Sequence, residues 1–273
     1  MKYAILGVVA AAGYYGVFTL SQPAHFRAHT HRPARQGDTW SWHGRIAAGH
    51  AVEIRNINGS VSAEPASGDQ VEVTAVKRAG RRGDAEDVRI EAQEHDGDVT
   101  ICVVYPGRSR SDGCAQRGGS GHGDDRNDTS VEFTVHVPRG VIFSGHTVNG
   151  GVEAVGLTAA VDVSTVNDGI HIETSSGDVQ ASTVNGSIVV VATGSGTRPL
   201  RFHTVNGGIT VTLPHDLAAD VEASTVNGAI TTDFPITVDG RMTPRRLHGR
   251  IGQGGRSLEL ETVNGSIRIR SAM

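Results

Sequence analysis

The stretch Thr183-Val184-Asn185-Gly186-Ser187-Ile188-Val189-Val190 decides the fold, because its turn recurs along the C-terminal half of the chain. Thr-Val-Asn followed by Gly or Asp occurs six times, and a related Asn-Gly turn lies near the start. The asparagines are Asn58, Asn149, Asn167, Asn185, Asn206, Asn227 and Asn264. From Asn149 onward the intervals are 18, 18, 21, 21 and 37 residues. Self-similarity at a short period is typical of a repeat architecture, in which each unit packs on its neighbours.

The 18-residue interval divides into two halves of nine residues. Apolar residues stand at Val152, Val161, Ile170, Val179 and Ile188, and a second follows each of them two positions later. Such alternation indicates a short strand with one face inward. We therefore predict an all-β, single-stranded β-solenoid with flattened coils of about 18–21 residues, in which successive coils stack in register. The 37-residue interval contains an excursion over 233–250 that is nearly one extra coil long.

An antiparallel sandwich of Asn-Gly hairpins is the alternative fold. The sameness of the side chains at each coil position favours the solenoid, because an antiparallel meander does not require it.

The repeated turn has a chemistry of its own. Asn-Gly tolerates positive φ, as tight turns require. Asparagines stacked at one site form a ladder of side-chain amides, and we expect the seven asparagines to have this structural role. A polar strip that binds a repeating polymer is the functional alternative.

The remainder of the chain divides by composition. Lys2 precedes an uncharged run over 4–20, so residues 1–24 are expected to be a signal peptide or a retained membrane anchor, although arginines follow the run. Residues 25–43 read as a polar linker, in which Trp40 and Trp42 form an entry strand that caps the stack. The solenoid is expected over 44–273, with a long surface loop over 107–130.

Cys102 and Cys114 are the only cysteines. In an exported chain they are candidates for a disulfide that closes a loop, and two unpaired thiols are the alternative.

Neither composition nor motifs point to chemistry. The net charge is −4 and aromatic residues make up 4% of the chain, which argues against nucleic-acid binding. No nucleophile elbow, phosphate loop or zinc-protease motif occurs. The outward positions of the predicted strands, including His171, Glu173 and Gln180, form no acidic cluster of the kind that polysaccharide-cleaving β-helices need. We therefore expect no enzyme, no cofactor and no metal site; calcium binding by the aspartates of the 107–130 loop stays open, because their spacing matches no known motif.

Three motifs carry a resemblance to a known family. They are Ile54 to Val61, Phe133 to Pro138, and the repeated Thr-Val-Asn-Gly turns. Over roughly 44–272 the chain resembles the family called putative adhesin, a bacterial family of β-strand repeat domains of unknown function. The resemblance implies a β-solenoid placed outside the cytoplasm, secreted or tethered to the membrane, and it carries over no catalytic residues.

The expected function is a non-enzymatic, adhesin-like or scaffolding interaction module of the cell envelope, whose partner is an envelope protein or a glycan. A protein that binds or degrades polysaccharide and a membrane-tethered envelope sensor are the alternatives.

Overall fold

The computed structural model describes residues 39–81, 84–106, 114, 127–238 and 243–272. All of them belong to one compact unit, Ala34–Met273. The expected signal or anchor (1–24), most of the expected linker and most of the 107–130 loop lie outside the described residues. Within the described ranges, no helix is long and apolar enough to cross a membrane.

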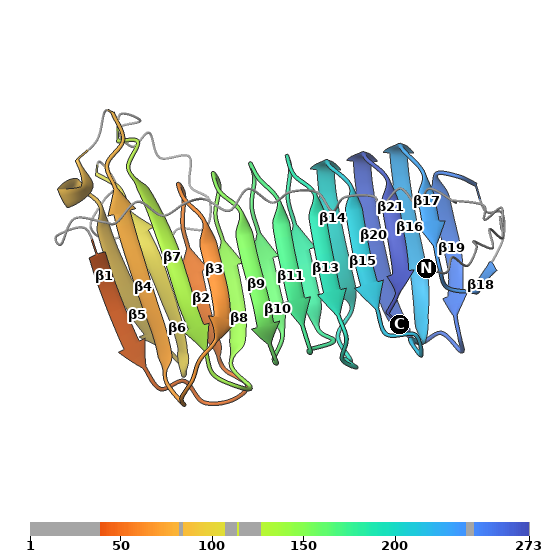
Figure 1. The fold of residues 1–273 in the computed structure, drawn as a ribbon, viewed down its shortest axis with the longest axis horizontal. Coiled ribbons are helices and arrows are strands. Elements are labelled where there is room, and N and C mark those ends of the chain that lie inside the picture. The colour runs from red at the N-terminus through yellow and green to blue at the C-terminus, as the bar shows by residue number, and fades with distance from the viewer. Residues whose placement is uncertain (1–38, 82–83, 107–113, 115–126, 239–242, 273) are drawn as a thin grey trace, which may run out of the picture. The chain divides into compact units, whose positions relative to one another are not determined.

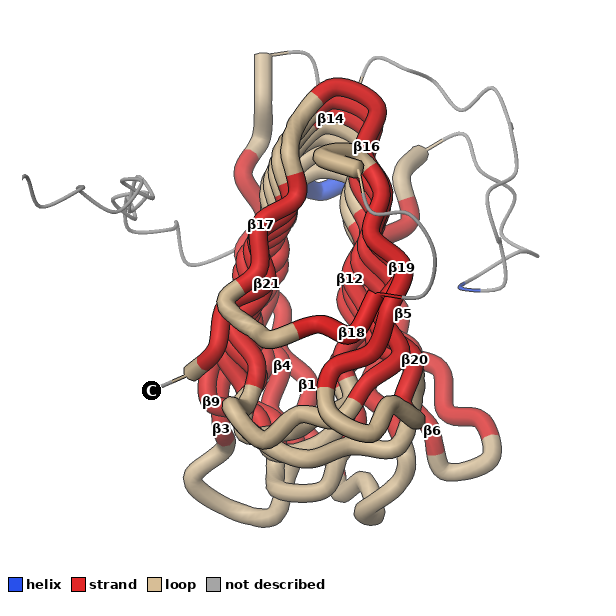
Figure 2. The backbone as a smooth tube through the Cα atoms, turned by 90° about the vertical axis from the view of Figure 1, so that its right-hand side faces the viewer, coloured by secondary structure: helices blue, strands red, loops and turns tan. Residues whose placement is uncertain are grey.

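Two β-sheets form this unit, and they face each other across the core (Figures 1 and 2). Sheet A has ten strands, in the spatial order β1 (Thr39–Gly44), β4 (Val71–Arg78), β7 (Ser130–Val137), β3 (Val61–Pro65), β9 (Val152–Leu157), β11 (Ile170–Thr174), β13 (Ile188–Ala192), β15 (Ile209–Leu213), β21 (Ile267–Ser271) and β17 (Ile230–Thr232). Sheet B has eleven, in the order β18 (Ile236–Val238), β19 (Arg246–Ile251), β16 (Ala219–Asn227), β20 (Arg256–Asn264), β14 (Leu200–Asn206), β12 (Val179–Ser182), β10 (Val161–Ser164), β8 (Ile142–His146), β2 (Ala51–Arg55), β6 (Asp98–Val104) and β5 (Arg89–His95). A short 3-10 helix, η1 (Ala85–Asp87), precedes β5.

From β8 to β15 the chain alternates between the two sheets, so that each coil contributes one strand to each. Neighbouring coils pair in parallel and in register, as in Val161 with Val179 and Ile170 with Ile188. This confirms the predicted solenoid and its division into nine-residue halves. The antiparallel sandwich is excluded for these coils because every one of their inter-strand ladders is parallel.

The core lies between the sheets and consists mainly of stacked aliphatic side chains. Alternation along each strand directs every second residue inward, as the buried–exposed pattern of β11 and β15 shows. Ile170, Ile188 and Ile209, which follow successive Asn turns, are each at most 1% exposed. Phe133, Phe143 and Phe202 are the largest fully buried side chains. The scarcity of aromatic residues in the sequence is therefore compatible with a closed core.

The order of the coils departs from prediction at both ends. The coil of β20 and β21, the last in the sequence, lies between the coil of β14 and β15 and the coil of β16 and β17. In Figure 1 the darkest blue strands accordingly stand inside the lighter blue ones. At the other end, β2 and β3 lie between β8 and β9 on one side and β6 and β7 on the other. The expectation that coils stack in sequence order is thus confirmed for the middle and wrong at the two ends.

Antiparallel strands close both ends of the stack. β4 and β1 add to sheet A beyond β7, and β5 adds to sheet B beyond β6. At the opposite end β19 and β18 add to sheet B beyond β16. The excursion over 233–250 is therefore a cap and not an extra coil. Capping strands cover coil ends that would otherwise expose core and unpaired backbone groups.

The entry strand expected at Trp40 and Trp42 is confirmed. It is β1, whose two tryptophans pack against the end of the core. The first sheet strand thus begins at Thr39, inside the segment expected to be linker.

Candidate interaction surfaces

The seven candidate asparagines all come together on one edge of the stack, which we call the Asn edge. In six of the seven, the side-chain amide Nδ2 donates to the Oδ1 of the neighbouring asparagine at 2.7–2.9 Å, and Asn58, at one end, accepts. In space the ladder runs Asn58, Asn149, Asn167, Asn185, Asn206, Asn264 and Asn227. It is continuous through seven coils, including the coils that are out of sequence order, so its direct role is structural.

The threonines of the turns point the opposite way, into the stack. Each is buried, and its Oγ1 donates at 2.7–2.9 Å to the carbonyl oxygen of the residue that follows the ladder asparagine in the neighbouring coil. The buried hydroxyl of each of these six threonines thereby has a hydrogen-bond partner.

The glycines of the turns serve a purpose that the sequence did not predict. Among the turn residues only Gly59, Gly150 and Asp168 have positive φ, so the prediction of positive φ at the asparagines and at most of the glycines is wrong. Space is the reason instead. A Cβ at Gly186 would overlap the carbonyl oxygen of Asp168, and one at Gly207 would overlap that of Gly186. Glycine is required because the coils approach closely at the turn.

The valine of each turn points outward, and it was the residue whose role the sequence analysis missed. Val148, Val184 and Val226 are 37%, 39% and 56% exposed, and they are the exposed large hydrophobic side chains of the described chain. By register the equivalent residues of the seven coils stand in one row beside the ladder, which we call the valine row: Ile57, Val148, Val166, Val184, Val205, Val263 and Val226. Val166, Val205 and Val263 are half-buried, and so is Ile57, which packs against the core. Seven coils at ~4.8 Å spacing give a row about 29 Å long. The sequence motif already indicated this row, because an aliphatic residue recurs at an exposed turn position where packing of the core does not require one.

Cys102 and Cys114 form the disulfide expected of them, with their Cα atoms 5.4 Å apart. Cys114 is thereby held against the outer face of sheet B. Arg55 on β2 adds a second attachment, because its Nη1 donates to the carbonyl oxygen of Cys114 at 2.6 Å.

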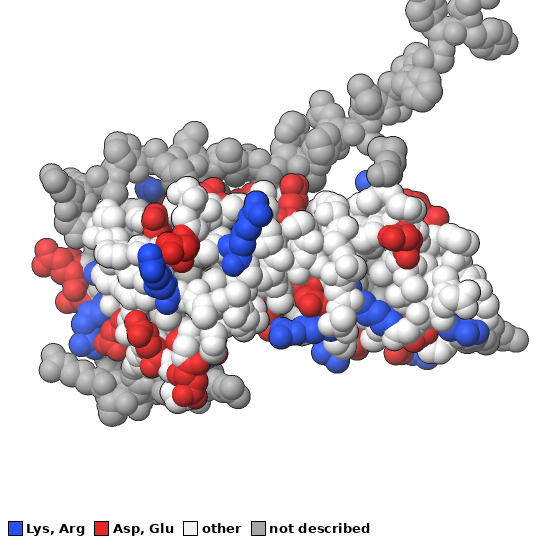
Figure 3. Space-filling view, turned by 90° about the horizontal axis from the view of Figure 1, so that it is seen from below, with Lys and Arg blue, Asp and Glu red and all other residues white. Residues whose placement is uncertain are grey.

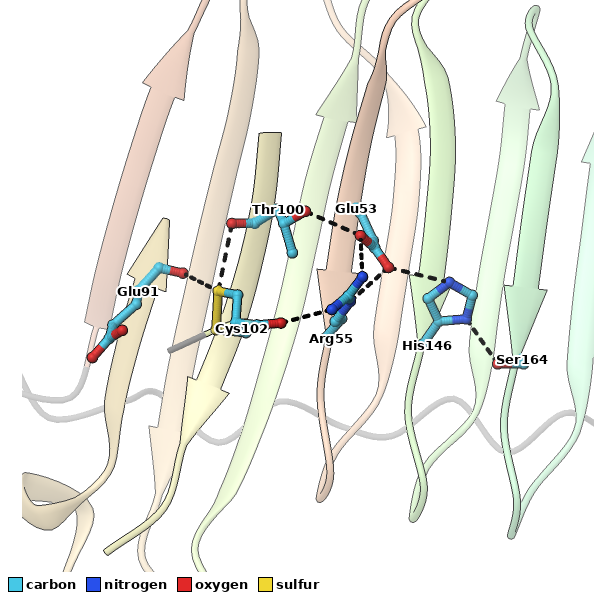
Figure 4. A network of polar contacts seen from close by, with 8 residues as sticks. Glu53, Arg55, Glu91, Thr100, Cys102, His146 and Ser164 are labelled. Atoms are coloured by element: carbon cyan, nitrogen blue, oxygen red, sulfur yellow. Dashed lines mark hydrogen bonds and ion pairs between the residues drawn. A yellow bond between two sulfur atoms is a disulfide. The ribbon is translucent and has the colours of Figure 1, made fainter. Parts of the chain in front are cut away.

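Arg55 belongs to a polar network on this face that the sequence analysis also missed. The Glu53 carboxylate accepts from Arg55 Nε at 2.6 Å and from Thr100 Oγ1 at 3.0 Å. His146 on β8 bridges to β10, since its Nδ1 lies 2.8 Å from Ser164 Oγ and its Nε2 lies 3.7 Å from Glu53 Oε1 (Figure 4). No sequence motif links these residues; the register of four strands brings them together.

A serine, a histidine and a carboxylate in a row invite comparison with a hydrolase triad. The histidine–carboxylate distance of 3.7 Å is too long for a hydrogen bond. Arg55 and Thr100 already bond the carboxylate, and the neighbouring Thr165 N–H donates to Ser182 within the sheet instead of facing a reacting oxygen. The arrangement therefore lacks the geometry of a nucleophile site. It joins four strands and Cys114.

The wider coils leave a cavity on the edge opposite the Asn edge. It measures about 360 Å³ and is lined by Thr193, Gly194, Ser195, Gly196, Pro214, Asp216, Leu217, Ala218 and Arg256. The Arg256 side chain is only 10% exposed; its Nε donates to the Arg198 carbonyl oxygen at 2.6 Å and its Nη2 bonds Gly177 and Asp178. The pKa of Arg256 lies below its usual range because burial disfavours the charged guanidinium. The opposite charge of Asp178 offsets only part of this lowering. Since Asp178 already neutralises the charge of the guanidinium, Arg256 has a structural role: it links its own strand to the loops of Gly177 and Arg198.

Charge is evenly mixed over the part of the surface seen in Figure 3, where basic and acidic side chains are interspersed among uncharged ones. Among the described residues, no three His, Cys, Asp or Glu side chains gather as a metal-binding group.

Comparison with known families gives one match. Residues 144–270 match the model of the Toastrack family, DUF4097. This range contains six of the seven ladder turns and supports the resemblance drawn from the sequence, although it does not include 44–143. No curated protein matches the sequence.

Two solved structures match over most of this chain. A putative cell adhesion protein from Clostridium sporogenes ATCC 15579 is 14% identical, with a TM-score of 0.44, and the match covers 86% of this chain and 100% of that one. A putative adhesin from Bacteroides fragilis NCTC 9343 is 10% identical, with a TM-score of 0.25, and the match covers 86% of this chain and 97% of that one.

Proposed function

We propose that this chain, whose residues 144–270 match the Toastrack family, works outside the cytoplasm as a non-enzymatic, adhesin-like interaction module. The Asn edge is its binding surface, and the valine row carries the proposal. All three exposed large hydrophobic side chains of the described residues fall on that row. Water-exposed aliphatic groups in an ordered row mark a surface that another molecule covers.

The rigidity of the edge suits it to recognition. Amide ladders, buried threonine bonds and parallel backbone pairing hold every turn in one position, so little conformational entropy is lost when a partner binds. An extended partner lying along the stack meets a valine and an amide at each coil. A linear envelope protein segment fits this pattern best, because the row offers aliphatic contacts and no aromatic platform for sugar rings.

Placement outside the cytoplasm rests on the disulfide. Cys102 and Cys114 are bonded, and such bridges persist in oxidising compartments. Protease treatment of intact cells that express a tagged full chain tests the placement. Degradation of the tag without lysis is expected, and a fully protected cytosolic protein would contradict it.

The binding surface is tested by capture from envelope fractions with the full chain as bait. Val148→Asp, Val184→Asp and Val226→Asp together are expected to abolish capture, because each places a charge in the row. The matched control carries the same charges on the outward face of sheet B, as Gln180→Asp, Ser182→Asp and Ser224→Asp, and keeps the partner. Equal capture by both triple variants would rule out the Asn edge.

A glycan array separates the remaining alternatives. Binding to glycans that is lost in the valine variant would replace the protein partner by a polysaccharide. Cleavage of any glycan would overturn the non-enzymatic assignment.

A further inference from the structure

The outward face of sheet A carries an ordered charge pattern that the Asn edge does not involve. Two rows cross β9, β11, β13, β15 and β21 in register. In this strand order the first row is Glu153, His171, Val189, Thr210 and Arg268, and the second is Val155, Glu173, Val191, Thr212 and Arg270. Among these five strands, acidic side chains therefore lie on β9 and β11, neutral ones on β13 and β15, and basic ones on β21; at the two margins the second row ends in Glu64 on β3 and in Asp233 after β17.

These charges are too far apart to pair within one chain. From β9 to β21 there are four inter-strand steps, or about 19 Å at ~4.8 Å each. Among the described residues, Glu153, Arg268 and Arg270 take part in no ion pair, and all three are exposed. Glu173 bonds only its strand neighbour His171, at 3.1 Å. The arginines thus have carboxylate counterparts on the same face but out of reach.

We propose that a second copy of this chain packs on the outward face of sheet A, about a two-fold axis that runs parallel to the strands over β13. Rotation about this axis exchanges β21 with β9 and β15 with β11. Arg268 then faces Glu153 of the second copy, and Arg270 lies one strand away from its Glu173. Each contact occurs twice, as a two-fold interface requires.

The side chains at the centre of the interface are small and uncharged. Val189 and Val191 meet their own copies on the axis, and the threonines of β15 face β11. Across β9 to β21 no like charges face each other, whereas at the two margins Glu64 faces the Asp233 that follows β17 in the other copy, and both of these side chains are exposed. The opposite charges fix the register of the two sheets and favour this pairing over a slipped one.

The available area is consistent with a reversible dimer. The rotation superposes seven strands, β3 to β17, in the order that the sheet has. Seven strands at ~4.8 Å and five residues at ~3.3 Å cover roughly 550 Å² in projection. Side-chain relief increases this area toward the ~800 Å² per partner of ordinary stable interfaces.

Cysteine cross-linking of the full chain tests the axis. The sequence contains two cysteines and both are in the disulfide, so an added cysteine is the only free thiol. Val191→Cys places two thiols next to each other across the axis and is expected to give a cross-linked dimer with a short bismaleimide. Ser182→Cys, exposed on the outward face of sheet B, is the matched control and is expected to stay monomeric. Equal cross-linking of both variants, or none with Val191→Cys, would overturn the proposal.

Charge exchange provides the sharper test, because it does not depend on the added thiol. The pair Arg268→Glu and Arg270→Glu is expected to weaken dimerisation about tenfold or more by sedimentation equilibrium, since like charges then face each other. The pair Glu153→Arg and Glu173→Arg is expected to do the same. Mixed together, the two variants restore the dimer as a heterodimer, because every contact again joins opposite charges. Failure of the mixture to associate, with circular dichroism showing both variants folded, would refute the pairing.

The dimer is independent of the proposed binding at the Asn edge. The valine variants leave sheet A unchanged and keep the dimer, whereas the charge variants leave the valine row unchanged and keep a partner bound there.

Discussion

At the scale of the residue, the four positions of the Thr-Val-Asn-Gly turn have different roles. Threonine and asparagine form hydrogen bonds between coils, glycine allows the coils to approach closely, and valine points outward. The sequence predicted the asparagine ladder, because an amide both donates and accepts and its repetition at one site has few other uses. It did not predict why glycine follows, since positive φ is the usual reason for Asn-Gly and close approach between coils is invisible in a single turn. The role of the outward valine was not predicted, because this residue disturbs neither the repeat of the turn nor the apolar–polar alternation of the strands.

The ladder leads to a first prediction. Asn185 donates to Asn167 and accepts from Asn206, so Asn185→Ala removes two hydrogen bonds. Both are solvent-exposed, which places the loss of unfolding free energy near 1 kcal/mol, at the lower end for bonded amides. Urea denaturation followed by circular dichroism measures it. Ser182→Ala, on an exposed strand position, is the control and should change stability by less than about 0.5 kcal/mol. A loss no larger than the control would mean that the ladder is not stabilising.

The glycines lead to a second prediction. Gly207→Ala forces a Cβ against the carbonyl oxygen of Gly186 in the neighbouring coil, and backbone on both sides leaves it little room to move. We expect a loss of about 2 kcal/mol or more, as for other overpacked sites. Gly68→Ala is matched to it, because a Cβ at Gly68 meets nothing within 4 Å and its φ is not positive. Its melting temperature should equal that of the wild type, and equal melting temperatures for both variants would refute the steric argument.

At the scale of the element, strand positions and coil lengths were predictable while the outer surface was not. Two-residue alternation is a property of the sequence, so β10 to β13 fall where the nine-residue halves place them. The network of Glu53, Arg55, His146 and Ser164 depends on the register between strands far apart in the sequence, to which no local pattern gives access. The disulfide was predictable only as a pairing of the two available cysteines.

The disulfide gives a third prediction. Cys102 and Cys114 enclose a loop with a sequence separation of 12 residues, and bridging it constrains the unfolded chain. The Cys102→Ala and Cys114→Ala double variant should lose about 3 kcal/mol in the loop-entropy model. The retained bond from Arg55 to the residue at 114 uses a backbone oxygen, so it survives the substitution and moderates the local loosening. Thermal unfolding with and without a reducing agent measures the change. The double variant should not respond to the reductant, whereas the wild type should; a wild type that does not respond would contradict the prediction.

At the scale of the whole repeat unit, the order of the coils is the feature that the sequence concealed. All coils carry the same turn, so each turn can stack on any other, and a 21-residue interval allows Asn227 to follow Asn206 directly. The structure instead places the coil of Asn264 between them. Stacking there gives β20 parallel partners on both sides and leaves β16 to receive the antiparallel cap β19. Sequence periodicity identifies the members of such a stack without specifying their order.

The order of the coils gives the last prediction, because cysteine pairs in the valine row report which coils are neighbours. In the structure Val263 stands beside both Val205 and Val226, one strand spacing of ~4.8 Å from each, while Val205 and Val226 are two spacings or about 9.6 Å apart. A disulfide requires Cα atoms within about 7 Å. Val205→Cys with Val263→Cys, and Val226→Cys with Val263→Cys, should therefore form internal disulfides under mild oxidation. Val205→Cys with Val226→Cys should not, and peptide mass spectrometry distinguishes the three. A solenoid stacked in sequence order would give the opposite for the pair at 205 and 226, so this pair alone decides between the two arrangements.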